Sequence, residues 1–358
     1  MIYIIIGTKG QFVKMFPIMK FFDREKVAYK FIHTCQHYGI IEENRKRLKI
    51  RKPDVYLTFK KNDLRNIWDF LRWAPWVLWE ARRLPITKED YVLVHGDAES
   101  AILGFLIGKY FRAKVVHVEA GLRSGSFLEP FPEEIVRTIV DLGSDICFCP
   151  YKEDAQNIKG NQIKIITNGN TVFDSVRLAL EFEPSTETKK IMRTKCVPFL
   201  VHRKENLFAT ERIHLIISIL ESILKRGYKV IWPVHGNTEH ELKVKNVWNE
   251  IIRLKSCYDL ELSYFLDYVD FMHIVKHCQF VASDGAGLQK ESLFLNKPML
   301  IMRKKTEYIP SAGENSYLSF LDVERVNYFL DNLGQFKQTI KIEESPTRII
   351  VDYFKSLK

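Results

Sequence analysis

The sequence has no apolar segment long enough to cross a membrane and no tract that marks disorder. The apolar start of MIYIIIGTKGQ is short and no basic region precedes it, so we interpret it as a first β-strand and not as a signal peptide. No low-complexity tract, internal repeat or long block of like charge is evident. With 46% hydrophobic and 27% charged residues, the composition is that of a globular protein.

Cysteine is sparse and forms no recognisable metal or redox motif. The six cysteines are scattered without a C-x-x-C pair, and Cys147 and Cys149 in ICFCP would lie on one face of a strand. We therefore expect reduced, buried thiols in a cytoplasmic protein and no metal site. The first turn, GTKGQFVK, is neither G-x-G-x-x-G nor a P-loop. The sequence therefore does not indicate a binding site for a nicotinamide cofactor or for ATP, and we expect no cofactor.

The chain is basic, with 54 Lys and Arg residues against 44 Asp and Glu residues and a formal net charge of +10. This excess would suit nucleic acid, an anionic membrane surface or a phosphorylated small molecule. The basic residues are spread along the chain, and neither a zinc-finger spacing nor an RNP-type motif accompanies them. Nucleic acid is therefore not expected as a partner.

At 358 residues the chain is long for a single core, and its pattern predicts two domains. Runs such as YVLVHGD and AKVVHVE alternate with helical segments such as AILGFLIGKYF, and the alternation resumes at VPFLVH. It predicts an α/β fold of two doubly wound, Rossmann-like domains with parallel sheets. We expect an N-terminal domain at 1–180, a C-terminal domain at 181–345 entered through the polar stretch 181–195, and a helix at 346–358 that packs back on the first domain.

Unusual polar residues fall where the expected strands end. They are Asp97, Glu119, His202, His235 and Asp284. Ligands of open parallel sheets bind beyond the carboxyl ends of the strands. Two such sheets facing each other would gather these residues in one cleft between the domains.

The stretch HVEAGLRSGSFLEPFPEE, 117–134, concentrates carboxylates around a glycine-containing turn. Glu119 lies on one side of this loop and the pair Glu133 and Glu134 on the other, and Asp97 joins them from the preceding strand. Crowded, partly desolvated carboxylates acquire separated pKa values and so provide an acid and a base in one pocket. The alternative is a solvated acidic loop in which Arg123 pairs locally.

Two motifs of the second half suit a diphosphate. In SDGAGLQKES the turn Gly285, Ala286, Gly287 opens a helix whose N–H groups can face phosphate oxygens, and Glu291 could accept hydrogen bonds from a ribose. The alternative is an ordinary turn capped by Asp284.

In VHRKEN, Arg203 could neutralise a diphosphate while His202 transfers a proton, although a histidine in this position can also be structural. In GTKGQFVK, Lys9 and Lys14 are available to an anion.

In their order along the chain, GTKGQFVK, TCQH, VHGD, HVEAGLRSG, PFPEE, NGNTVFD, VHRKEN, PVHGN, SDGAGLQKES and RKKTEY resemble the motifs of the UDP-N-acetylglucosamine 2-epimerases. HVEAGLR followed by P-x-PEE is the most specific of them. The resemblance covers nearly the whole chain and implies the two-domain GT-B fold. It also implies proton abstraction at C2 with anti elimination of UDP, a 2-acetamidoglucal intermediate, and re-addition of UDP with protonation of the opposite face.

The resemblance implies roles position by position. Four residues would surround the reacting sugar as catalytic groups: Asp97, Glu119, Glu133 and His202. Ten would bind the UDP-sugar: Lys9, Lys14, Arg123, Arg203, His235, Phe271, Gly285, Ala286, Gly287 and Glu291. The family's dimers further imply a homodimer, and its products imply amino sugar metabolism and polysaccharide biosynthesis.

The sequence departs from the family pattern only in the nucleotide-binding motifs. The usual G-T-R-P-E is Gly-Thr-Lys-Gly-Gln at 7–11, S-D-S-G-G is Ser-Asp-Gly-Ala-Gly at 283–287, and T-E-R-P-E is Thr-Glu-Tyr-Ile-Pro at 306–310. We therefore expect the family's reaction on UDP-N-acetylglucosamine or a modified UDP-2-acetamido sugar. The opening motif favours the non-hydrolysing branch over the branch that releases UDP and N-acetylmannosamine.

The segment LRNIWDFLRWAPWVLWEARR, 64–83, holds four of the six tryptophans. It predicts a helical stretch that Pro75 kinks or splits. One interpretation is an interfacial helix on anionic lipid, which would suit a GT-B glycosyltransferase with a membrane-linked acceptor. The favoured interpretation is a helix in the core or at a dimer interface.

Overall fold

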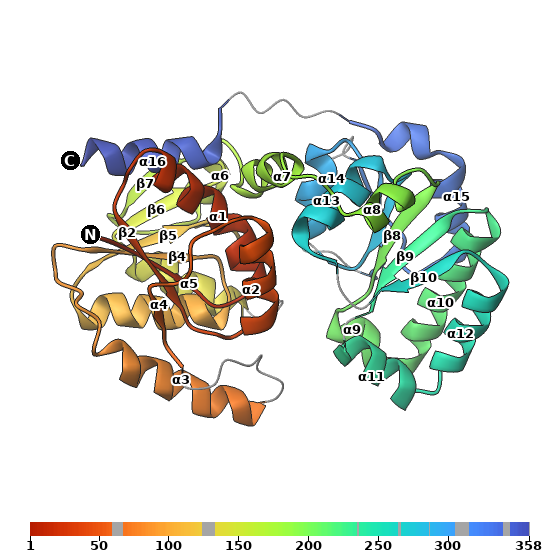
Figure 1. The fold of residues 1–358 in the computed structure, drawn as a ribbon, viewed down its shortest axis with the longest axis horizontal. Helices are drawn as coiled ribbons and strands as arrows, with labels where there is room; N and C mark the ends of the chain where they lie inside the picture. The colour runs from red at the N-terminus through yellow and green to blue at the C-terminus, as the bar shows by residue number, and fades with distance from the viewer. Residues whose placement is uncertain are drawn as a thin grey trace. The chain divides into compact units, whose positions relative to one another are not determined.

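The computed structural model describes residues 1–58, 67–123, 133–234, 236–263, 266–285, 287–304, 315–338 and 344–357. Two compact units make up the chain (Figure 1). Unit 1 consists of Met1–Leu178 together with Ile342–Lys358, and unit 2 consists of Ala179–Lys341.

Unit 1 is built on a parallel sheet with helices on both faces (Figure 1). In the described ranges its strands run in the order β3-β2-β1-β4-β5-β6-β7. They are β1 (Ile2–Ile6), β2 (Tyr29–His33), β3 (Val55–Tyr56), β4 (Tyr91–His95), β5 (Lys114–Val118), β6 (Ile146–Cys149) and β7 (Ile163–Ile166). The central strands are buried almost throughout, as expected for parallel strands covered by helices on both sides.

The helices of unit 1 cover that sheet. They are α1 (Lys9–Arg24), α2 (Tyr38–Arg47), α3 (Ile67–Ala81), α4 (Glu99–Tyr110), α5 (Glu133–Gly143), α6 (Lys152–Gln156), α7 (Val172–Leu180) and α16 (Pro346–Ser356). The start of α1 is fixed by a capping box, in which Thr8 accepts from the backbone of Gln11 and the Gln11 side chain accepts from the backbone of Thr8.

The C-terminal helix α16 belongs to unit 1 and packs on α1. Phe354 lies edge-on to Phe22 and to Tyr91, with ring centroids 5.8 and 5.6 Å apart. Arg348 and Lys355 both pair with Glu25 just after α1, at 2.7 and 2.8 Å. An apolar face and a pair of cations thus hold the end of the chain on the first unit.

Unit 2 has a second parallel sheet, in the order β10-β9-β8-β11-β12-β13. Its strands are β8 (Cys196–Leu200), β9 (Lys229–Pro233), β10 (Leu260–Ser263), β11 (Val281–Ser283), β12 (Met299–Ile301) and β13 (Ser316–Leu318). Its helices are α8 (Thr186–Ile191), α9 (Lys204–Leu207), α10 (Thr210–Lys225), α11 (Gly236–Val244), α12 (Trp248–Cys257), α13 (Tyr268–His277), α14 (Gly287–Phe294), α15 (Val323–Asp331) and the short 3-10 helix η1 (Leu333–Phe336).

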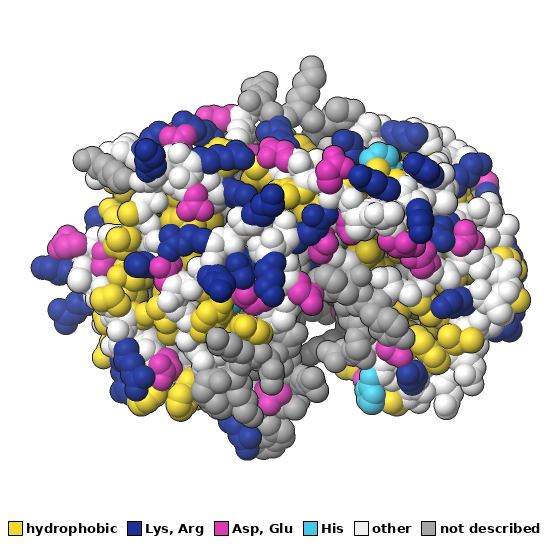
Figure 2. Space-filling model, viewed as in Figure 1, with side chains coloured by type: hydrophobic (Ala, Val, Ile, Leu, Met, Phe, Trp, Pro, Cys, Tyr) yellow, Lys and Arg dark blue, Asp and Glu magenta, His cyan; other side chains and the backbone are white. Residues whose placement is uncertain are grey.

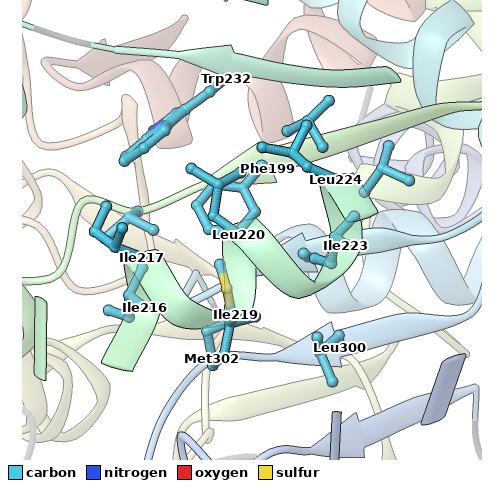
Figure 3. Close-up of a cluster of buried hydrophobic side chains, with 14 of the residues drawn as sticks. Phe199, Ile216, Ile217, Ile219, Leu220, Ile223, Leu224, Trp232, Leu300 and Met302 are labelled. Atoms are coloured by element: carbon cyan, nitrogen blue, oxygen red, sulfur yellow. The ribbon is translucent and has the colours of Figure 1, made fainter. Parts of the chain in front are cut away.

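Helix α10 supplies much of the core of unit 2. Ile213, Ile216, Ile217 and Leu220 recur at the spacing that lines one helical face, and all four are buried. Figure 3 shows Phe199 and Trp232, from neighbouring strands, facing the side chains of this helix. The two rings pack edge-on with centroids 5.0 Å apart.

The α/β class predicted from the sequence is confirmed, and each predicted strand quoted above is present. Of the kink or split predicted at Pro75, the split is wrong, because α3 runs through this proline as a single helix. In the part of the chain that the structure describes, no helix is both long and apolar enough to traverse a bilayer.

Candidate active site

Both units carry their unusual polar residues at the point where the strand order reverses. In unit 1 this point lies between β1 and β4. After β1 the chain enters α1 at Lys9, and the loop after β4 contains Asp97. In unit 2 it lies between β8 and β11, followed by His202 and Asp284. Such switch points open a crevice beyond the strand ends and are the usual ligand sites of doubly wound sheets.

Glu119 follows β5 and is the most enclosed of the predicted catalytic carboxylates, with 7% of its surface exposed. The Lys14 ammonium, from α1, lies 2.5 Å from Oε2 of Glu119, and His95 Nε2, from the end of β4, lies 3.4 Å from the same oxygen. The Asn170 amide donates to Oε1. The backbone φ of Glu119 is +64°, a conformation that costs free energy for a residue with a side chain.

Asp97 is joined to a second carboxylate through Arg137, which the sequence analysis did not identify. Arg137 projects from α5, donates through Nη2 to Asp97, and donates through Nη1 to Glu134 at 2.6 Å. Burial opposes the charge of Arg137, but Asp97, Glu134 and Glu119 together raise its pKa above the ordinary value. Glu133, the predicted catalytic residue, begins the same helix and is half-buried beside the buried Glu134.

Arg123, a predicted substrate ligand, is part of a buried hydrogen-bond network. Its Nη1 donates to Asp141 at 2.6 Å, and Asp141 also contacts His117 Nδ1 at 2.7 Å. Burial alone would raise the pKa of Asp141, but the hydrogen bond from His117 and the charge of Arg123 hold it below its usual value. Because the backbone N–H of Gly121 also points at Asp141, this network fixes the loop that follows Glu119.

Gln11 holds the backbone between the end of β1 and Lys9, the first residue of α1, in place. Its Oε1 accepts from the backbone N–H of Gly7 at 2.9 Å and from the Ser100 hydroxyl at 2.5 Å, while its Nε2 donates to the His95 carbonyl at 2.9 Å. A side chain at Gly7 would collide with Ser100 and with Thr34, so this close approach requires glycine. The backbone N–H of Lys9 donates to His37 Nδ1 at 3.4 Å.

In unit 2, Asp284 is fully buried and ties β11 to the loop after β8. It accepts from the backbone N–H groups of His202 and Arg203, at 3.1 and 3.0 Å, and from the Asn206 amide at 3.1 Å. The half-exposed ring of His202 places Nδ1 3.2 Å from Asp284 Oδ1. A Cβ on Gly285 would lie 2.7 Å from His202 Cε1, so glycine lets the turn pass beside this ring.

Three other predicted ligands of the UDP-sugar lie on α13 and α14. Glu291, on α14, is buried and accepts from the Tyr268 hydroxyl at 2.9 Å. Burial and the negative charge of Glu291 raise the pKa of Tyr268 well above its ordinary value. Phe271 is half-buried on α13, and Gly287 begins α14.

The structure brings together the predicted residues Lys14 and Glu119 in unit 1, and His202 and the Asp284 turn in unit 2. His235 and Ala286 lie outside the described residues. Residues that the sequence analysis missed are Arg137, Asn170, Asp141 and Tyr268. Over the described ranges, no group of three or more His, Cys, Asp and Glu side chains is arranged to hold a metal ion.

Known proteins with a similar sequence share one family. The family model described as UDP-N-acetylglucosamine 2-epimerase matches residues 20–322. A UDP-N-acetylglucosamine 2-epimerase of Methanococcus maripaludis is 30% identical over 331 residues, which cover 87% of this chain and 86% of that protein. A protein of the same name from Methanocaldococcus jannaschii is 30% identical over 317 residues, covering 85% of this chain and 84% of its own length.

Solved structures agree in fold. The Methanocaldococcus jannaschii UDP-GlcNAc 2-epimerase in complex with UDP-GlcNAc and UDP matches with a TM-score of 0.84 at 24% identity, over 99% of each chain. The co-structure of S. aureus MnaA with UDP matches with a TM-score of 0.82 at 25% identity, over 100% of this chain and 97% of that one. The architecture is therefore GT-B, as the sequence motifs predicted.

Proposed function

The chain belongs to the UDP-N-acetylglucosamine 2-epimerase family and is an enzyme of the isomerase type; on this premise we propose that it interconverts a UDP-2-acetamido sugar and its C2 epimer. The observation that carries the proposal is the enclosed carboxylate Glu119, held between Lys14 and Asn170 just beyond the end of β5, the strand next to β4 at the switch point of unit 1. Because this carboxylate is already largely shielded from bulk water, it can exchange a proton with a bound sugar without a separate desolvation step.

The proposed reaction needs a base, an acid and a stabilised leaving group. A base takes the proton from C2, the C2–H electron pair forms the C1–C2 double bond, and the C1–O bond breaks so that UDP departs with its electron pair. Because no carbonyl acidifies this C2–H bond, positive charge develops at C1, and nearby carboxylates stabilise it. Return of UDP to C1, with a proton delivered to the other face of C2, completes the epimerisation.

The four proposed catalytic residues are Asp97, Glu119, Glu133 and His202. Asp97 and Glu119 lie beyond adjacent strands of one sheet, so they can act on the same face of a bound ligand. Arg137 forms an ion pair with Asp97 and holds that carboxylate in place. His202 is half exposed and carries a buried partner, Asp284, which orients its ring for proton transfer to or from the departing oxygen.

The diphosphate is assigned to unit 2. Arg203 follows β8, and α14 follows the adjacent strand β11. The guanidinium of Arg203 and the N–H groups at the start of α14 therefore supply positive electrostatic potential beyond the ends of these two strands. Glu291 would accept hydrogen bonds from the ribose, and Tyr268 orients it. The other proposed ligands of the UDP-sugar are Lys9, Lys14, Arg123, His235, Phe271, Gly285, Ala286 and Gly287.

UDP-N-acetylglucosamine is the reference substrate, since two of the related proteins carry its name and one solved structure holds it. The opening motif at 7–11 supports a modified UDP-amino sugar as the alternative substrate. Lysine in place of arginine at position 9 offers a point charge instead of a planar fork, which changes how a phosphate or a sugar substituent is held. We propose the non-hydrolysing reaction, in which UDP is returned to the sugar.

Product analysis tests this function. Purified protein is incubated with UDP-N-acetylglucosamine, and the products are separated and identified by proton and phosphorus NMR. A mixture of gluco and manno UDP-sugars is the expected result. Free N-acetylmannosamine with stoichiometric UDP would show that the enzyme catalyses the hydrolysing reaction instead. Recovery of unchanged substrate with every UDP-2-acetamido sugar tried would contradict the proposal.

A homodimer through α3 and α4 completes the proposed assembly. Their outer faces expose Leu71, Trp79, Leu106 and Tyr110, and a groove of about 490 Å³ between the two helices is lined by apolar side chains and by Arg82. Trp, Tyr and Arg are the residues most enriched at protein interfaces. Lysine and arginine are otherwise distributed over the visible face of the molecule (Figure 2).

Light scattering behind gel filtration tests the dimer. The wild type is expected at twice the mass of its chain, and Trp79→Glu with Tyr110→Glu is expected at the mass of one chain. A wild-type monomer that binds vesicles of anionic phospholipid, and not vesicles of phosphatidylcholine alone, would assign this face to a membrane surface instead.

A further inference from the structure

Asn170 lies in the loop between β7 and α7, and its amide bridges two parts of unit 1. It is 2% exposed. Its Oδ1 accepts from the backbone N–H of Val172 at 3.0 Å, and its Nδ2 donates to Glu119 Oε1, 51 residues away in sequence. A backbone N–H can bond only to the oxygen of the amide, so the orientation of the Asn170 side chain is fixed with its NH₂ group toward Glu119.

This orientation constrains the carboxylate. An NH₂ group donates and cannot accept, so Oε1 of Glu119 must be an acceptor. Oε2 faces the Lys14 ammonium at 2.5 Å, so it also faces a donor. A carboxyl group whose two oxygens both meet donors is stabilised in its ionised form.

Glu119 also needs to be held in place. Its φ of +64° is an unfavourable conformation that persists only when surrounding contacts determine it. The backbone N–H of Ala120 donates to Phe148 at 3.0 Å and fixes the main chain after Glu119. Asn170 fixes the carboxylate end of the Glu119 side chain. It does so from the loop between β7 and α7, which is separate from the loops that follow β4 and β5.

Among the described residues, charged or titratable groups from α1, β4 and α5 act on Glu119. Lys14 comes from α1, His95 from the end of β4, and Arg137 of α5 feels its charge through space. Each of these groups is cationic or becomes cationic on protonation. Asn170 is the neutral member of the set, so its effect can be separated from theirs by substitution.

We propose that Asn170 is a positioning residue that keeps Glu119 ionised and aimed at the C2 proton of the bound sugar. The inference rests on the proposed function, because it assigns Asn170 to the same reaction. It extends that function by a residue that touches neither the sugar nor the nucleotide and acts through Glu119.

Two substitutions separate the donor of Asn170 from its acceptor. Asn170→Asp keeps the oxygen that caps the Val172 N–H but replaces the donor with a second carboxylate oxygen beside Glu119. Asn170→Ala removes both groups. Asn44→Ala is the matched control, because Asn44 is a fully buried asparagine of unit 1 whose Nδ2 donates to the Ile40 carbonyl, at 2.7 Å, within α2.

Steady-state kinetics over a range of pH gives the first readout. Both Asn170 variants are expected to lose about 10- to 100-fold in kcat with little change in KM, because a hydrogen bond to the ionised carboxylate is removed. The acidic limb of the kcat profile is expected to move to higher pH, furthest in Asn170→Asp, where two carboxylates repel. Asn44→Ala is expected to lower the Tm without moving this limb.

Carbon NMR of protein labelled with [δ-¹³C]glutamate gives a second readout that needs no turnover. The Glu119 signal is assigned by its loss in Glu119→Gln, and its titration midpoint is expected at higher pH in both Asn170 variants than in wild type. If wild type fails to epimerise any UDP-sugar, the proposed function is wrong and this titration still tests the contact. A midpoint and an acidic limb that stay where wild type has them in Asn170→Asp would overturn the inference.

Discussion

His202 Nδ1 lies 3.2 Å from Asp284 Oδ1, although the two residues are 82 positions apart and follow different strands of unit 2. Asp284 is fully buried, whereas half of the His202 side chain is exposed. The buried member of the pair therefore fixes the orientation of the exposed member. The same carboxylate accepts the backbone N–H groups of His202 and Arg203, so one residue sets the geometry of the whole loop.

Asp284→Asn should weaken both the fold and the reaction. The substitution turns one acceptor oxygen into an NH₂ group that faces N–H donors, and an unpaired buried group of this kind costs about 1–3 kcal/mol. We expect the Tm to fall by roughly 5 °C and kcat to fall, because the His202 loop loses its anchor. Differential scanning fluorimetry and an epimerase assay measure the two effects.

Asp322→Asn is the control for that substitution. Asp322 is the exposed N-cap of α15, where asparagine caps as well as aspartate. It should leave Tm and kcat unchanged. Equal losses in Asp284→Asn and Asp322→Asn would contradict the anchoring role of Asp284.

Glu119→Gln and Asp97→Asn should each remove turnover while preserving affinity for UDP. Both substitutions keep the shape of the side chain but remove the group that exchanges a proton, which is worth about 100- to 10,000-fold in rate. UDP is assigned to unit 2, so its Kd from calorimetry should not change. Asp145→Asn, a half-exposed carboxylate of unit 1, is the control. Near-normal turnover in either active-site variant would show that its carboxylate is not catalytic.

Arg137→Lys should uncouple Asp97 from Glu134. The guanidinium meets both carboxylates with separate nitrogens, whereas one ammonium cannot reproduce this fork. Because Glu134 is buried, loss of its partner should lower the Tm by several degrees, and movement of Asp97 should lower kcat about tenfold. Arg226→Lys, in an exposed pair with Asp331, should change neither quantity. A variant with wild-type kcat would separate Arg137 from the reaction.

Asp141 should make stability depend on pH in the acidic range. Its pKa is lowered in the folded protein, so its contribution is complete above the ordinary value of 3.8 and is lost as the pH falls through the lower folded value. Wild type should therefore exceed Asp141→Asn in unfolding free energy by about 1.5–3 kcal/mol at pH 7. Urea titrations from pH 7 to pH 3 should show this difference shrinking below about pH 4. A difference that stays constant down to pH 3 would exclude the charge of Asp141 as its source.

Sequence patterns predicted the parts of the fold that repeat a simple rule. Strands such as β1 and β4 are continuous apolar runs, and the segment that became α10 has helical spacing, so both were recognisable. The short strands β3, β10 and β13 were missed, because they are partly exposed and lack the continuous apolar run that marks a buried strand. The split expected at Pro75 did not occur, since a proline inside a helix can be tolerated when the helix is held by packing, as Val77 and Trp73 are here.

The candidate site was predictable only where a residue stands at a strand end or within a motif. Glu119 and His202 satisfy that condition. Arg137 lies in the interior of a helix, so nothing local in the sequence connects it to Asp97, 40 residues away. Asn170 lies within the motif NGNTVFD, but the motif alone does not connect it to Glu119, 51 residues away. Such partners are set by the packing of distant segments, and a single sequence contains no record of that packing.

Exchange at C2 tests the central claim most directly. Wild type and Glu119→Gln are incubated with UDP-N-acetylglucosamine in deuterated water, and the C2 position of the recovered sugar nucleotides is followed by NMR. Breaking and re-forming the C2–H bond predicts deuterium at C2 in both the gluco and the manno UDP-sugar with wild type, and none with Glu119→Gln. Epimerised product that keeps its original hydrogen at C2, or exchange that is as fast in Glu119→Gln as in wild type, would contradict the account.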